Sequence, residues 1–251
     1  MIKPNIAQIY ADYIDHKNKQ NVDERYVGKE SYFHASATAT CLRKHWFRIN
    51  KVEESDFTPM VNNRIMRLGT IVHNDYENAL KFAFDNNNTN NTINSTIYSS
   101  NIESISTEGE IQIPEYNVRG FYDAVFKMKT GEVYLYDFKT IRSYPYKLKF
   151  GRNPQPSPNT LHEQQLATYG IAIEKEFGRL DGMFLYYYNK DSSVCKEKEV
   201  PMHYMDMARE SWEEVQDNCL SNVPPPVELG MSPKLNWECK YCNYQTHCQD
   251  N

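Results

Sequence analysis

The chain has 251 residues, of which 40% are hydrophobic and 13% aromatic, and this composition excludes a globally disordered protein. Its formal net charge of -5 argues against indiscriminate binding to phosphate-rich surfaces, although it does not exclude a local basic track. No segment approaches the roughly 18 apolar residues of a membrane span, and the N-terminus lacks the apolar run of a signal peptide. We therefore expect a cytoplasmic protein without membrane contact.

The first third of the chain predicts helices. Apolar residues recur at helical spacing from Ile6 to Ile14, which indicates an amphipathic helix. Residues 36–51 predict a turn that leads into a second helix, and residues 62–84 predict a longer one. The asparagine-rich segment 85–95 suits neither a core nor a helix, so we interpret it as an exposed loop.

From about Ile102 the pattern changes to that of strands. Three consecutive antiparallel strands are predicted around residues 109–113, 117–126 and 131–138, because turn signals separate them. A helix over 161–178, a strand over 181–189 with a possible partner at 197–202, and a helix over 204–220 follow. We divide the chain into an N-terminal helical region (1–61), a core (62–222) and a cysteine-rich C-terminal segment (223–251).

Two predicted strands carry a group of charged residues suited to phosphodiester hydrolysis. Asp123 lies among apolar neighbours, and Asp137 and Lys139 are two residues apart on the next strand, which places them on one face. Carboxylates hold Mg²⁺ or Mn²⁺ beside a scissile phosphate, and a lysine orients water and offsets developing charge. The alternative is an Asp-Lys pair on the solvent face of a hairpin.

Neighbouring helices offer further polar residues. His73 lies in the helix before the strands; a lone helical histidine is more often structural, but its imidazole suits Mn²⁺. Gln165 and Tyr169 are four residues apart in the later helix and therefore share a face. An amide and a phenol placed in this way would suit contact with a DNA strand or support of the catalytic lysine.

The segment from Lys139 to Arg152 is basic, contains aromatic residues and lacks acids, which is typical of segments that contact single-stranded DNA. An ordinary solvated loop is the alternative. The residues that we expect to contact DNA are Arg142, Tyr144, Tyr146, Lys147 and Lys149.

The C-terminus contains three cysteines in a C-x2-C-x5-C arrangement, Cys239, Cys242 and Cys248. A tight turn between the first two brings both thiolates to one metal centre, and the third adds another ligand. Cys41 is our candidate for the fourth ligand. Cys195 and Cys219 are the rival candidates, but both lie in predicted regular elements, where a small buried thiol is the default interpretation. His247 completes a zinc site in the alternative interpretation.

In order and spacing, these motifs resemble the RecB-like branch of the PD-(D/E)XK nuclease superfamily. Within it they are similar to iron-sulfur exonucleases, including CRISPR-associated and phage-encoded members and the nuclease domain of AddB. The resemblance implies an α/β fold with a restriction-endonuclease-like core, in which helices flank a central mixed sheet. It also implies that a [4Fe-4S] cluster joins the N- and C-terminal segments through Cys41, Cys239, Cys242 and Cys248.

The resemblance further implies the roles of the core residues. His73, Asp123, Asp137 and the Phe138 carbonyl would coordinate Mg²⁺ or Mn²⁺. Lys139 would assist the attacking water, while Gln165 and Tyr169 match a Q-x3-Y motif that supports the site. Asp137 stands where many members carry Glu, and the asparagine-rich insertion has no counterpart.

The expected function is that of a metal-dependent DNA exonuclease acting on single strands or DNA ends. Its setting would be phage replication or recombination, DNA repair or CRISPR adaptation, with proteins of those processes as partners. The alternative is a catalytically silent DNA-binding adaptor with a structural zinc or iron-sulfur site.

Overall fold

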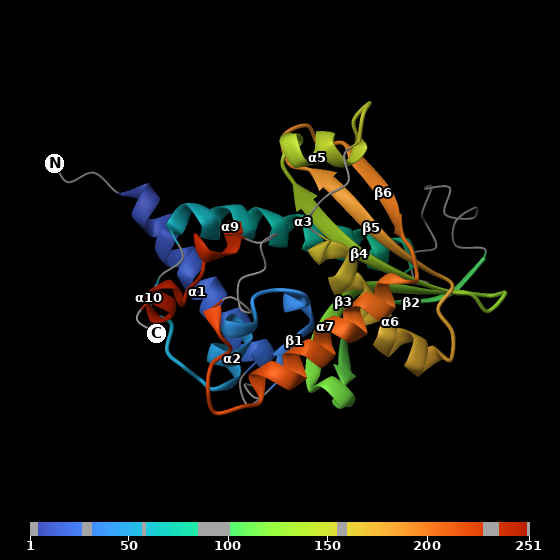
Figure 1. The fold of residues 1–251 in the computed structure, drawn as a ribbon. Helices are drawn as coiled ribbons and strands as arrows, with labels where there is room; N and C mark the ends of the chain where they lie inside the picture. The colour runs from blue at the N-terminus through green and yellow to red at the C-terminus, as the bar shows by residue number, and fades with distance from the viewer. Residues whose placement is uncertain are drawn as a thin grey trace.

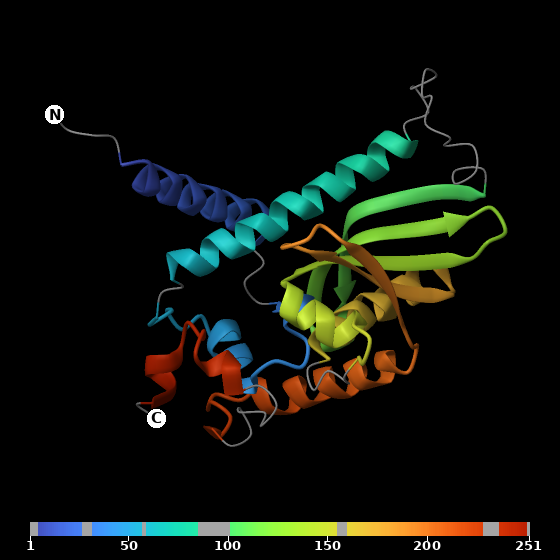
Figure 2. The same ribbon diagram turned by 90° about the horizontal axis from the view of Figure 1, so that it is seen from above.

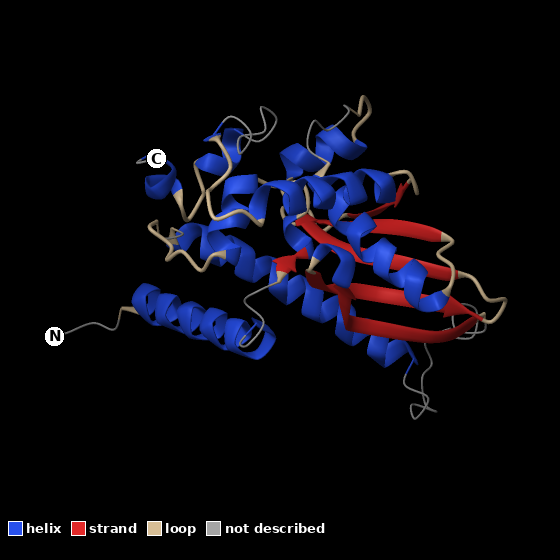
Figure 3. Cartoon of the chain, turned by 60° about the horizontal axis from the view of Figure 1, so that its bottom comes forward, coloured by secondary structure: helices blue, strands red, loops and turns tan. Residues whose placement is uncertain are grey.

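A computed structural model describes residues 5–26, 32–56, 59–84, 101–154, 160–227 and 236–249 of the chain. Figures 1 and 3 show helices on both sides of one sheet. The helices are α1 (Ile6–Tyr26), η1 (Ala35–Ala37), α2 (Leu42–Ile49), α3 (Met60–Phe84), η2 (Pro114–Tyr116), α5 (Ser143–Phe150), α6 (Leu161–Phe177), α7 (Tyr204–Cys219), α9 (Asn236–Cys239) and α10 (Gln245–Gln249). The strands are β1 (Phe33–His34), β2 (Ile102–Ile113), β3 (Val118–Met128), β4 (Val133–Ile141), β5 (Gly182–Asn189) and β6 (Cys195–Val200).

The sheet is mixed, and β3 pairs with three other strands, β1, β2 and β4. The predicted meander of three strands is confirmed, since β2 pairs antiparallel with β3 and β3 antiparallel with β4. The chain then crosses over through α6, so that β5 runs parallel to β4, and β6 returns antiparallel to β5. The short β1 pairs parallel with the first residues of β3.

Helices cover the two faces of the sheet unequally. Helix α6 packs against strands β2 to β5, and α7 packs on α6, which forms the main core on that side. Helix α3 crosses the opposite face, where it contacts β2, β3 and β4 (Figure 2). The fully buried Leu135, Leu166 and Leu185 show that the α6 side holds the better-packed core.

Helix α6 has the sequence of a buried helix rather than of a surface one. Leu166, Ala167 and Ile173 are fully buried along it, and Gly178 ends it with a positive φ of 73°. Its approach to β3 also requires a glycine in that strand. A Cβ atom on Gly120 would lie 2.7 Å from the Cβ of Ala35 and 3.0 Å from Cε1 of Tyr169.

The C-terminal segment packs against α2 and the residues that follow it. The C-terminal helices α9 and α10 lie beside α2 in both ribbon views (Figures 1 and 2). Hydrogen bonds join the two segments: Thr246 donates to Asp56, and the Ser55 main chain donates to the Asn243 carbonyl at 2.9 Å. The Lys44 ammonium lies 3.3 Å from the Glu238 carboxylate.

Most predicted elements are confirmed, but several short ones were not predicted, among them α5 and β1. Helix α5 is not among the predicted elements, and it contains Pro145 in its first turn, where a helix tolerates proline. Strand β1 has only two residues, too few for an alternating pattern. The asparagine-rich segment 85–95 lies outside the described residues. None of the helices within the described ranges is long and apolar enough to cross a membrane.

Candidate active site

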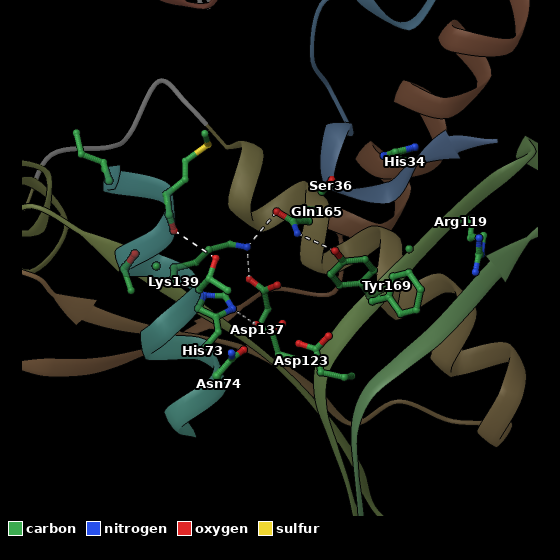
Figure 4. A pocket seen from close by; sticks show the side chains of 18 of the residues that line it. His34, Ser36, His73, Asn74, Arg119, Asp123, Asp137, Lys139, Gln165 and Tyr169 are labelled. Atoms are coloured by element: carbon green, nitrogen blue, oxygen red, sulfur yellow. Dashed lines mark hydrogen bonds and ion pairs between the residues drawn. The ribbon is translucent and has the colours of Figure 1, made fainter. Parts of the chain in front are cut away.

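The two carboxylates lie where strands β3 and β4 separate. The last residue pair of these strands is Ala124 with Tyr136, and Asp123 and Asp137 follow it directly. The main-chain N–H of Phe138 donates a hydrogen bond of 2.5 Å to Asp123 Oδ2, which holds that carboxylate beside β4. Figure 4 shows both carboxylates at the cavity between the sheet and helices α3 and α6.

Asp137 is a buried acid whose charge is poorly compensated. It is 1% exposed, and the Lys139 ammonium lies 2.6 Å from its Oδ2, although not in the geometry of a hydrogen bond. Burial raises the pKa of Asp137 to about 6, because the nearby Asp123 adds to the effect of burial and Lys139 only partly opposes it. The predicted placement of Asp137 and Lys139 on one strand face agrees with this contact.

Helix α3 brings His73 to the carboxylates. Its Nδ1 lies 3.5 Å from Asp123 Oδ2, and its ring stands perpendicular to the Phe138 ring. Burial lowers the pKa of His73, but the hydrogen bond and charge of Asp123 outweigh burial and raise it above its usual value. The Phe138 side chain itself lies against Tyr76, with ring centroids 5.0 Å apart, so only its main chain is available to the site.

Helix α6 holds the lysine from the other side. The Lys139 ammonium donates to Gln165 Oε1 at 3.0 Å, and the Gln165 amide donates to the Tyr169 hydroxyl at 2.7 Å (Figure 4). Tyr169 is buried and is fixed by packing. The arrangement is a row of three polar side chains that fixes the position of the ammonium beside Asp137.

All of these side chains line one cavity of about 480 Å³. The cavity continues past Tyr169 to His34, Ser36 and Arg119 (Figure 4). Burial, with Arg48 and Arg119 nearby, lowers the pKa of His34 to about 4, so this imidazole is neutral. The sequence does not predict this end of the cavity, because its position depends on the two-residue strand β1. The one sequence feature that points to it is a basic residue in β3, Arg119.

The structure divides the expected DNA-contact residues of helix α5 into two groups. Tyr146 is buried, and the Lys149 ammonium lies 3.4 Å from the buried Glu163 carboxylate, so these two face the protein. The other three face solvent, and Tyr144 has 74% of its surface exposed. The outward-facing residues are Arg142, Tyr144 and Lys147.

The four cysteines predicted to share a centre line one cavity of about 210 Å³ between α2 and the C-terminal helices. Cys41 precedes α2, whereas the other three come from the C-terminal segment. Burial raises the pKa of Cys41 to about 11 and also raises that of Cys242. As free thiols, these two side chains are therefore protonated at neutral pH. The residues are Cys41, Cys239, Cys242 and Cys248.

The rival ligands lie elsewhere. Cys219 is fully buried and donates to the Leu42 carbonyl at 3.2 Å, while Cys195 contacts the Tyr76 hydroxyl at 3.1 Å. His247 Nε2 lies 3.0 Å from the Glu53 carbonyl oxygen. None of the three lines the cysteine cavity.

Both groups of side chains have the chemistry of metal ligands, although their present spacing is wider than a bound ion requires. Among the residues that the structure describes, no three His, Cys, Asp or Glu side chains stand ready to hold a metal ion. The His73 imidazole and the Asp123 and Asp137 carboxylates nevertheless line one cavity, and nitrogen and carboxylate donors of this kind fit Mn²⁺ or Mg²⁺. Four thiols around one small cavity likewise fit a thiolate-bound centre.

Comparisons with solved structures give matches of low sequence identity. A crystal structure of the protein SSO0001 matches with a TM-score of 0.55 and 19% identity, over 98% of this chain and 97% of that one. Two crystal structures of the alkaline exonuclease LHK-Exo from Laribacter hongkongensis, one in complex with dAMP, each match with a TM-score of 0.44. Their identities are 13% and 14%, and each match covers 82% of this chain and 94% of the other. A search of curated proteins gives no match.

A family model covers most of the chain and includes most of the site. The model of the PD-(D/E)XK nuclease superfamily matches residues 75–249, which contain both carboxylates, the lysine and the three C-terminal cysteines. His73 and Cys41 precede the matched region. The mixed sheet flanked by helices agrees with the fold expected for such nucleases. The chain thus belongs to the PD-(D/E)XK nuclease superfamily.

Proposed function

We propose that this protein is a metal-dependent DNA exonuclease of the RecB-like branch, acting on single strands or DNA ends. One observation carries the proposal, namely that an imidazole, two carboxylates and an ammonium group meet in one cavity where β3 and β4 separate. This set suits the binding of a divalent cation beside a phosphodiester. The residues are His73, Asp123, Asp137 and Lys139.

His73, Asp123, Asp137 and the Phe138 carbonyl are the proposed ligands of Mg²⁺ or Mn²⁺. When bound, such a cation polarises the phosphate and lowers the pKa of a bound water. Lys139 would hold the attacking water and offset charge on the phosphate, a role that requires a fixed ammonium. The Gln165 amide and the Tyr169 hydroxyl fix it through hydrogen bonds of 3.0 and 2.7 Å.

The proposed DNA contact is the outer side of helix α5. Arg142 and Lys147 supply charge there, and the exposed Tyr144 supplies a ring on which a base can stack. Tyr146 and Lys149 support this surface from beneath, because both pack into the protein. We place the activity in the cytoplasm, in phage replication or recombination, DNA repair or CRISPR adaptation, with partners from those processes.

We further propose a [4Fe-4S] cluster at the four cysteines. The support is that all four thiols line one cavity, while His247 and the other two cysteines lie outside it. The centre would join the N-terminal region (1–61) to the C-terminal segment (223–251) around the core (62–222). A bond across so long a stretch of chain restrains the unfolded state strongly.

The test of activity uses single-stranded DNA labelled at either end, together with a circular single strand of similar sequence. We expect Mn²⁺-dependent digestion of the linear DNA, no digestion of the circle, and a loss of about 100-fold or more in Asp137→Ala. Asp75→Ala is the matched control, since Asp75 is an exposed carboxylate on the same helix as His73.

Each other outcome has a definite meaning. Equal digestion by wild type and Asp137→Ala would remove the proposed site. Digestion of the circle would show an endonuclease, and binding without any digestion would show a silent adaptor.

A further inference from the structure

One buried cation lies in the wall of the cysteine cavity. Arg43, in the first turn of α2, is 4% exposed and lines the cavity with the four cysteines. Its Nη1 donates to the Pro225 carbonyl at 2.9 Å, and its guanidinium lies over the Phe47 ring at 5.5 Å. Its Nε and Nη2 are buried without any hydrogen-bond partner.

Such a guanidinium is costly to bury unless an anion compensates it. Among the described residues, no carboxylate oxygen lies within 4 Å of the Arg43 guanidinium, so no ion pair offsets its charge. Glu238 is the acidic residue of the cavity wall, and it has other partners. It accepts hydrogen bonds from the Cys41 main-chain N–H and from the Lys44 ammonium, both at 3.3 Å.

At the same end of α2, further hydrogen-bond donors lie near the sulfur of Cys41. Cys41 is the N-cap residue of this eight-residue helix, and the nearby main-chain N–H groups of Lys44 and Arg43 favour the thiolate form of its side chain, although burial outweighs them and raises its pKa. The positive end of the helix dipole therefore faces the thiol. Together with the guanidinium, these donors make the α2 side of the cavity electropositive.

We infer that Arg43 is the charge partner of an anionic, thiolate-bound metal centre in this cavity. The inference rests on the proposed four-cysteine centre and adds a residue to it. A metal centre held by four thiolates carries net negative charge, and hydrogen bonds to its sulfurs raise its reduction potential and its retention. The sulfurs of such a centre would accept hydrogen bonds from the Nε and Nη2 groups of Arg43.

A purely structural role explains less of the geometry. Tying α2 to the chain at Pro225 uses only one N–H group, and packing on Phe47 needs no charge. Those two contacts leave the buried Nε and Nη2 atoms of Arg43 without a function. Binding of an anionic centre gives both a partner and neutralises the charge.

The test compares wild type with Arg43→Met and Arg43→Lys, each purified with its centre under anaerobic conditions. Arg48→Met is the matched control, because Arg48 is exposed on the same helix. The measurements are iron, sulfide and zinc content, the rate at which a chelator removes the metal, and the midpoint potential of the centre. Circular dichroism checks that each variant is folded.

We expect Arg43→Met to lose its metal about tenfold faster than wild type, as the loss of a hydrogen bond to a charged group implies. Its midpoint potential should fall, Arg43→Lys should lie between the two, and Arg48→Met should match wild type. Equal retention and potential in Arg43→Met and Arg48→Met would overturn the role of Arg43 while leaving the centre intact. Wild type without any bound metal would instead overturn the centre, and the role of Arg43 with it.

Discussion

Replacement of Asp137 by asparagine should stabilise the metal-free protein and abolish its activity. Asparagine has the shape and the neutral charge of the protonated acid, and burial disfavours the ionised form of Asp137. The change therefore removes a buried charge that the fold tolerates in the absence of a cation. Residues of a catalytic site commonly show this opposition between stability and function.

The magnitude follows from the pKa of the acid. Burial in the folded state raises the pKa of Asp137 from 3.8 to about 6. At about 1.4 kcal/mol per unit, ionised Asp137 costs the folded state about 3 kcal/mol above pH 6. Because the folded protein binds this proton more tightly, the cost is absent below about pH 4 and grows as the pH rises to about 6.

The assay is urea unfolding of both proteins in EDTA at several pH values. We expect the free energy of unfolding of Asp137→Asn to exceed that of wild type by about 3 kcal/mol at pH 8 and to match it near pH 4. In thermal unfolding the gain at high pH corresponds to roughly 6 to 12 °C. Added Mn²⁺ should stabilise wild type only, since the variant lacks the proposed ligand.

A destabilised variant would contradict this expectation. If the metal-free variant were less stable than wild type at pH 8, the ion pair with Lys139 would outweigh the cost of burial, and Asp137 would be a structural residue.

Three further predictions test other parts of the molecule. Lys139→Met should lower the cleavage rate about 100- to 10,000-fold but leave single-strand affinity almost unchanged by gel shift, while the control Lys127→Met, at a half-buried lysine of β3 that pairs with Glu103, keeps its activity. Trp212→Ala should reduce the free energy of unfolding by about 3 to 5 kcal/mol in urea, because this side chain is fully buried; a loss below about 1 kcal/mol would contradict its place in the core. Cys239→Ser should lose the bound metal by elemental analysis, whereas Cys195→Ser should retain it, and the reverse result would reject the proposed ligand set.

The sequence predicts most of the framework because strong local patterns produce it. The alternating strands and the periodic helix α6 are examples, and the two-residue spacing of Asp137 and Lys139 already implies one shared face. Contacts between segments that lie far apart in the sequence could not be predicted from local patterns. His34 enters the cavity through a two-residue strand, and the inward direction of Tyr146 depends on how α5 docks. Arg43 looked like one more basic residue, since only the fold shows that it is buried.

The meeting of α2 with the C-terminal helices has a consequence for the order of folding. Its hydrogen bonds join residues about 190 positions apart, such as Asp56 with Thr246 and Ser55 with Asn243. Contacts of such long sequence separation form late, because closing the loop costs entropy before any contact compensates for it. During synthesis, the surface of α2 beside Cys41 and Arg43 stays uncovered until the C-terminal segment has been made. Until then it is an exposed face that chaperones and premature oxidation can reach.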